Sequence, residues 1–171
     1  MPLIERVYEL ERARQVSIIP FFYTAQFLTG VAVGTSVTVN TGIQSDSDFI
    51  CRYMTITVYN SPNNLILALL APLTISLFDN SSGRTLMDNA TAIQNVMGGP
   101  PGTVGGSGGS APFIFPEPWL IRAGGTVQTT LTNQTSAAIG TGGSTFPRVD
   151  IAYSGMKVFK FGSSSPAGSL L

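Results

Sequence analysis

The stretch Leu73–Asp79, LTISLFD, decides the fold, because its aliphatic residues alternate with hydroxyl-bearing or aromatic ones. A period of two is that of a β-strand, whose successive side chains point to opposite faces. The polar run Asn80–Gly83, NSSG, follows at once and is typical of a tight turn. The segment therefore predicts a strand with one buried face that ends in a chain reversal.

The same alternation extends over most of the chain. It recurs, with β-branched and aromatic residues, in Val31–Val39, Tyr53–Tyr59, Thr126–Asn133 and Val149–Phe159. Shorter candidate strands occupy residues 21–28, 43–50 and 113–121, and Gly155 is expected to form a bulge in the last long strand. Roughly eight short runs joined by polar turns predict an all-β fold, an antiparallel β-sandwich. One very long connection between the runs favours a jelly roll.

Three segments differ from the sandwich domain, which is predicted to span residues 17–161. The first segment is residues 1–16. Its first 14 positions hold six of the 18 charged residues of the chain, and Leu3, Val7 and Leu10 follow helical spacing. We expect this segment to be an N-terminal arm, either a short helix or extended. The Gly-rich segment 98–112 is expected to be a long loop. Residues 162–171 are expected to form a C-terminal tail.

Composition argues against several classes of function. The chain has 171 residues, of which 11% are charged, with a formal net charge of zero and no His. Without His, Ser-His-Asp triads, Cys-His pairs and His-ligated metals are impossible. The single cysteine, Cys51, cannot form a disulfide within the chain, and we expect it to be buried. We expect no enzymatic activity and no cofactor.

Other sequence features argue against binding of a small ligand or nucleic acid and against a membrane span. The Gly-rich segment lacks the Lys and the following helix of a phosphate-binding loop, and Asp46-Ser47-Asp48 lacks the remaining ligands of a calcium loop. The balanced charge gives no sign of nucleic-acid binding, and the apolar run Leu65–Leu73 is too short to span a bilayer. No export signal is evident, so synthesis in a cytoplasm is expected.

Three segments carry a resemblance to a known family. They are LFDNSSGRTLMDN at residues 77–89, FPEPWLIRAGGTVQTTLTN at 115–133 and VDIAYSGMKVF at 149–159. Together they resemble small β-sandwich virion proteins of tailed bacteriophages, of the capsid decoration (cement) kind. The resemblance covers about residues 17 to 161 and consists of strand and turn signatures, so it supplies no catalytic residue.

The resemblance implies a position on the outer surface of a capsid, after synthesis in the cytoplasm of a bacterial host. The implied partners are the major capsid protein and further copies of this chain, with a trimer favoured over a dimer. Such contacts would stabilise the shell. Under this interpretation the arm and the Gly-rich loop make the contacts between subunits.

Candidate interface residues follow from the same interpretation. The cations Arg6, Arg12 and Arg14 are expected to pair with acids on the shell. The aromatic residues Phe21, Phe22, Tyr23 and Phe27 are expected to be buried anchors, although an ordinary place in the core is equally consistent with the pattern. For Trp119, an anchor at the rim or in the core is favoured over a sugar-stacking platform.

Two alternative functions stay open at this point. One is a head-tail connector or a tail-associated structural protein, because jelly rolls also occur there. The other is a carbohydrate-binding virion module for host attachment, whose stacking residues would be Trp119, Tyr53, Tyr59 and Tyr153.

Overall fold

The computed structural model describes residues 2–29, 31, 34–61, 64–66, 73–87, 89–96, 111–134 and 148–171. Its elements in chain order are α1 (Leu3–Arg12), β1 (Val16–Phe27), β2 (Ser36–Gly42), β3 (Asp48–Ser61), β4 (Asn64–Ile66), β5 (Leu73–Asp79), β6 (Arg84–Thr85), β7 (Thr91–Ala92), α2 (Ile93–Val96), β8 (Phe113–Ile121), β9 (Thr126–Asn133), β10 (Arg148–Lys160) and the 3₁₀ turn η2 (Gly168–Leu170). Most of the predicted loop 98–112, and Ala32 and Val33 of one predicted strand, lie outside the described residues.

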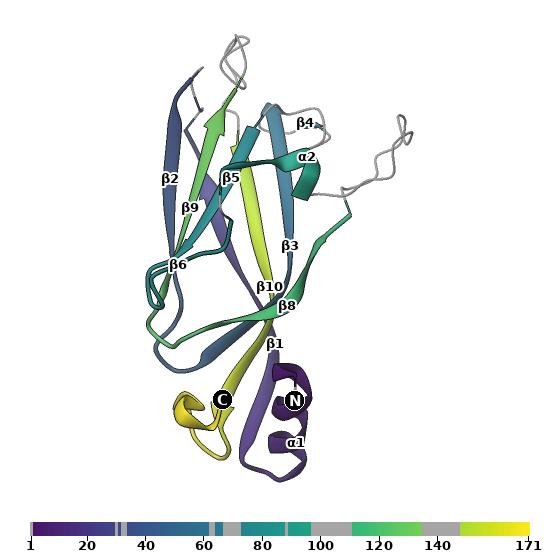
Figure 1. Ribbon diagram of the computed structural model, residues 1–171, viewed down its shortest axis with the longest axis vertical. Coiled ribbons are helices and arrows are strands. Elements are labelled where there is room, and N and C mark those ends of the chain that lie inside the picture. Colours follow the sequence, from purple (N-terminus) through teal and green to yellow (C-terminus); the bar gives the residue numbers. More distant parts are fainter. Residues whose placement is uncertain are drawn as a thin grey trace.

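Two antiparallel sheets pack face to face as a sandwich, which confirms the predicted fold class (Figure 1). Sheet A has the order β1-β10-β3, and β8 and β4 share the outer edge of β3. Sheet B has the order β2-β9-β5, and β6 and β7 share the outer edge of β5. Strands from the beginning and the end of the chain thus alternate within each sheet, which is the strand order of a jelly roll.

The main hydrophobic core lies between the sheets. In β9 the burial alternates along the whole strand, so that Val127, Thr129 and Leu131 point inward. Near the centre, the hydroxyl groups of Thr129 and Tyr153 are hydrogen-bonded across the sandwich at 2.5 Å. Burial raises the pKa of the Tyr153 hydroxyl, and it also raises the pKa of the Cys51 thiol to about 12. Both groups are therefore neutral parts of the packing.

A second, smaller core covers the outer face of sheet A near the two termini, which lie at the same end of the molecule (Figure 1). Val7 of α1 is fully buried in this core, together with Val16, Ile50, Met156, Val158 and Ala167. The N-terminal segment is a helix, one of the two forms predicted for the arm, and it packs against sheet A. Its apolar helix face is part of the folded domain, because Ile50, Met156 and Val158 face the helix and need a cover.

The C-terminal segment is fixed to the same face by polar contacts. The buried carboxylate of Asp48 accepts hydrogen bonds from the backbone N–H of Gly168 at 2.8 Å and of Ala123 at 3.1 Å. Arg122 in turn donates to the carbonyl of Gly168 at 2.9 Å. These bonds tie the predicted tail to the turn between β8 and β9, so it too belongs to the domain.

The expected bulge at Gly155 is present where β10 pairs with β3. The register shifts between Ser154 and Gly155, and Arg52 of β3 is the extra, unpaired residue. A Cβ atom added to Gly155 would lie 1.9 Å from the carbonyl oxygen of Ile50, far inside van der Waals contact. Only glycine fits this position without a backbone shift.

We expect Gly155→Ala to lower the free energy of unfolding by about 3 kcal/mol, because the backbone of β3 must move away from the new methyl group. Urea denaturation followed by circular dichroism measures the loss. Gly42→Ala in β2 is the matched control, since a Cβ there meets no atom within 4 Å. Its stability should change by less than about 0.5 kcal/mol. Equal losses in the two variants would contradict this account of the bulge.

Candidate interaction surface

The predicted anchors of β1 separate into two sets according to the face on which each lies. Phe22 points outward with 65% of its surface exposed, whereas Tyr23 and Phe27 are 9% and 1% exposed in the main core. Phe21 is half-buried against that core. The core interpretation therefore holds for Tyr23 and Phe27, and their assignment to an interface is wrong, because strand alternation points them between the sheets. Phe22 stays an interface candidate.

Trp119 also belongs to the core. Its ring packs edge-on against Tyr153, and its indole N–H donates to a carboxylate oxygen of Asp79 at 3.4 Å. Only 9% of the residue is exposed, so Trp119 offers no platform to a partner or a sugar. Tyr153 is buried as well, at 1% exposure. The carbohydrate hypothesis thus loses two of its four stacking residues.

The predicted cations remain on the surface. Arg6 and Arg12 are exposed on α1, and Arg14 is exposed in the turn that follows, where it adopts a φ of 55°. Among the described residues none of the three forms an ion pair. Their pairing with acids on a shell stays a prediction.

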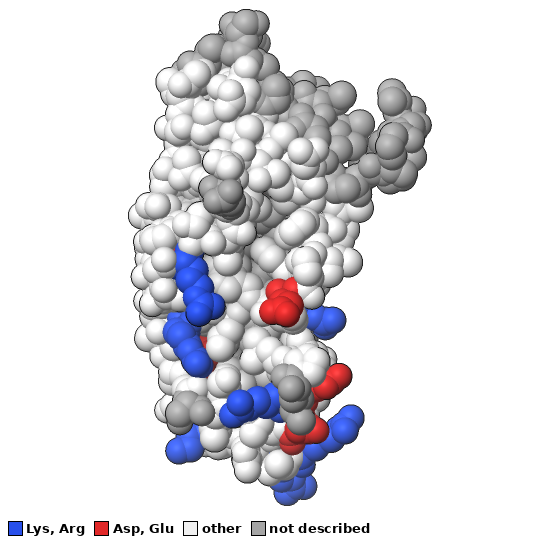
Figure 2. Space-filling model, viewed as in Figure 1, with Lys and Arg blue, Asp and Glu red and all other residues white. Residues whose placement is uncertain are grey.

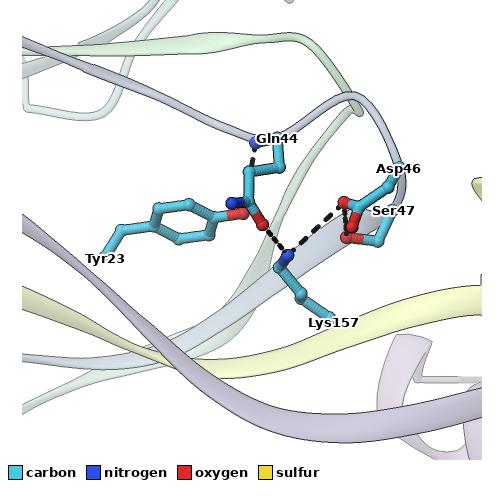
Figure 3. Close-up of polar contacts among 5 residues, drawn as sticks. All are labelled: Tyr23, Gln44, Asp46, Ser47 and Lys157. Atoms are coloured by element: carbon cyan, nitrogen blue, oxygen red, sulfur yellow. Dashed lines mark hydrogen bonds and ion pairs between the residues drawn. The ribbon is translucent and has the colours of Figure 1, made fainter.

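A buried lysine forms a cluster that the sequence analysis did not identify (Figure 3). The side chain of Lys157 on β10 is 6% exposed, and its Nζ lies 4.4 Å from the centroid of the Phe21 ring. The ammonium group donates to Oε1 of Gln44 and lies 3.4 Å from Oδ1 of Asp46. The backbone N–H of Gln44 donates to the hydroxyl of Tyr23 at 3.2 Å.

This cluster fastens the connection between β2 and β3 over the inner face of sheet A. Burial raises the pKa of Asp46, but hydrogen bonds from Ser47 and Lys157 outweigh that effect, so the pKa lies below its ordinary value. Asp46 is therefore a carboxylate at neutral pH and compensates the buried charge. The sequence held one signal for this cluster. In β10, Lys157 follows Tyr153 and Gly155 at intervals of two residues, so its side chain lies on the same inward face.

An apolar row crosses the outer face of sheet A beside the start of α1. The register aligns Phe22 of β1, Ser154 of β10, Tyr53 of β3 and Ile114 of β8. Tyr53 is 42% exposed and Ile114 is 71% exposed, a large exposure for such side chains. A shallow cavity of about 360 Å³ adjoins the β3–β8 end of the row, lined by Ile4, Arg52, Tyr53, Ile114, Phe115, Pro116 and Pro118.

The outer face of sheet B has a different character. Its central outward residues form three cross-strand rows: Ser36–Thr132–Thr74, Thr38–Thr130–Ser76 and Asn40–Gln128–Phe78. We call these nine residues the hydroxyl grid. The hydroxyls of Ser36 and Thr132 lie 2.6 Å apart and those of Thr38 and Thr130 lie 2.8 Å apart. No member is charged, and Figure 2 shows the described Lys, Arg, Asp and Glu of this view gathered in its lower half.

Comparison with known proteins assigns no family. No protein-family model and no curated protein matches the chain. Among solved structures, the chain is similar to one described as "Cyanophage Pam1 capsid asymmetric unit", with a TM-score of 0.38 and 17% sequence identity. That alignment covers 82% of this chain and 86% of the other. Within the described residues, every helix is too short or too polar to cross a membrane.

Asp79 supports a testable pH dependence. It is 1% exposed, and its carboxylate accepts from the hydroxyls of Ser81 at 2.5 Å and Ser82 at 2.7 Å, as well as from Trp119. Burial raises its pKa, but the hydrogen bonds from Ser81 and Ser82 outweigh that effect and hold the pKa below the ordinary 3.8. A depressed pKa stabilises the fold above the ordinary value, and this stabilisation is lost as the pH falls through the folded-state pKa.

We expect Asp79→Asn to be less stable than the wild type by about 2 kcal/mol at neutral pH, because its amide cannot accept the same set of bonds. The difference should shrink as the pH falls through the ordinary value of 3.8 toward the lower folded-state pKa, since the wild-type carboxyl becomes protonated first in the unfolded and then in the folded protein. Urea denaturation across the acid range measures both quantities. Ser82→Ala, which keeps the charge and removes one donor, should lose less. A gap that stays constant down to the lowest pH would contradict the assignment.

Proposed function

We propose that this protein is a structural component of a bacteriophage virion, a decoration or cement protein that binds the outer surface of the capsid. Its partners in this proposal are the major capsid protein and further copies of the chain. It acts by contact rather than by catalysis, and a chain without His lacks the commonest catalytic acid-base residue.

The hydroxyl grid is the observation that carries the proposal. Bringing a sheet face against a protein shell removes water from every outward side chain, and charged groups are the most costly to desolvate. The nine grid residues carry none. Eight of them have a hydroxyl or amide group, which can both donate and accept hydrogen bonds, and the ninth is Phe78. Such a face can adapt to a partner surface without an exact match of charges. Three segments, residues 77–89, 115–133 and 149–159, resemble decoration proteins in their strand and turn signatures, and this resemblance supports the same function.

A rigid platform is the second requirement of a cement protein. The grid lies on strands whose inner faces are buried in the main core, and β9 is paired on both sides, by β2 and β5. Force applied to the grid is therefore shared by two ladders of hydrogen bonds. The face can carry load without a change of shape.

The alternative of a connector or tail-associated protein uses the same fold, so the number of copies separates the two. Quantitative mass spectrometry of purified particles of the phage that encodes the chain gives the ratio to the major capsid protein. We expect a ratio between one copy per capsid subunit and one per few subunits. Roughly a dozen copies per particle would place the chain at the neck or tail, where symmetry offers few positions. Its absence from particles would overturn the virion proposal.

The grid itself is tested by adding a charge at its centre. We expect Thr130→Lys to fold normally, because the side chain points outward, and to reduce incorporation into particles by at least about tenfold, since the new charge must be desolvated. Thr85→Lys is the matched control, because Thr85 is exposed on β6 outside the grid. Equal incorporation of the two variants would show that the grid is not the contact.

A further inference from the structure

We propose that the cavity between α1, β3 and β8 is one half of a two-fold contact between two copies of this chain, in which Ile114 of each copy enters the cavity of the other. This inference deepens the proposed function, which requires contacts between copies, by naming the surface. It also favours a dimer over the trimer that the family resemblance implies.

The shape of the site supports a second copy as the occupant. Ile114 projects from β8 with 71% of its surface exposed, and it stands at the rim of the cavity of about 360 Å³. Among the other large lining side chains, Ile4 and Phe115 are apolar, as an aliphatic side chain requires, while Tyr53 is aromatic with a polar hydroxyl and Arg52 is charged. A projection beside a matching recess is self-complementary under a two-fold rotation, since each copy supplies both parts.

The charges at the rim supply an independent argument. Arg52 lines the cavity as the extra residue of the β3 bulge, and Glu117 is exposed on β8 between the lining prolines Pro116 and Pro118. Within the part of the chain that the structure describes, neither residue forms an ion pair. A two-fold axis that runs between β3 and β8 places Arg52 of one copy opposite Glu117 of the other. The same pair forms a second time on the other side of the axis. The register supplies what such an arrangement needs, because the β8 residues between Ile114 and Trp119, Glu117 among them, lie opposite Arg52 of β3.

The prolines keep this edge available for a defined contact. Pro116 and Pro118 remove two backbone N–H groups from β8, so the strand cannot extend sheet A by regular pairing with a foreign strand. The contact therefore proceeds through side chains on the face, which fixes its geometry and its stoichiometry.

The first test is the mass of the full-length protein in solution, by sedimentation equilibrium over a range of concentrations. We expect a reversible dimer of the 18.0 kDa chain. Ile114→Asp should abolish the dimer, and circular dichroism should show a normal fold, because Ile114 contributes little buried surface. Ile19→Asp is the matched control: Ile19 is also an exposed isoleucine, 51% exposed on β1, and it does not line the cavity, so this variant should dimerise normally.

Charge reversal tests the pairing itself. Arg52→Glu and Glu117→Arg should each weaken dimerisation by about tenfold or more, whereas the double variant should return it to within about threefold of the wild type. A wild-type protein that is monomeric at about 1 mM, a trimer, or equal effects of Ile114→Asp and Ile19→Asp would each overturn the inference. If the chain does not dimerise, the proposed function is still tested separately. Incorporation and copy number are measured on virions, whereas dimerisation is measured on the isolated chain.

Discussion

The packing of the whole structure depends on one bulge in β3, in which Arg52 is the extra residue opposite Ser154 and Gly155 of β10. Before this bulge the inward residues of β3 are Phe49 and Cys51, and after it they are Met54, Ile56 and Val58. The same shift directs Ile50 outward under α1 and Tyr53 outward into the apolar row. The main core, the second core and the cavity therefore all depend on a close approach of β3 to Gly155, which no other residue permits.

The charges are distributed in a way that follows from this architecture. Sheet A continues past the sandwich, where α1 and the C-terminal segment cover one face and the Lys157 cluster occupies the other. The charged residues of α1 belong to this end, whereas the grid belongs to the opposite sheet. In a chain with only 11% charged residues, this distribution leaves the hydroxyl grid without charge, as the proposed contact requires.

Local patterns could be read from the sequence, whereas long-range pairing could not. Alternation in Leu73–Asp79 and in Thr126–Asn133 predicted the strands, because one face of each is buried in the core. Periodicity could not say that β10 lies between β1 and β3, since register and order depend on contacts distant in the chain. For the same reason it left open whether Phe22 or Tyr23 faces the core, and it treated α1 as a separate arm although Ile50 and Val158 need its cover.

The two proposed contacts belong to different faces of the sandwich, and this separation has a consequence for assembly. Dimerisation through the cavity uses sheet A and leaves the hydroxyl grids of sheet B free on both copies. Because the two sheets are opposite faces of the sandwich, a dimer that packs through sheet A turns its two grids away from each other, so one grid can lie on a shell while the other faces away from it. In these proposals, therefore, one copy of each dimer contacts the shell through its grid, and the other copy is attached through the cavity contact alone.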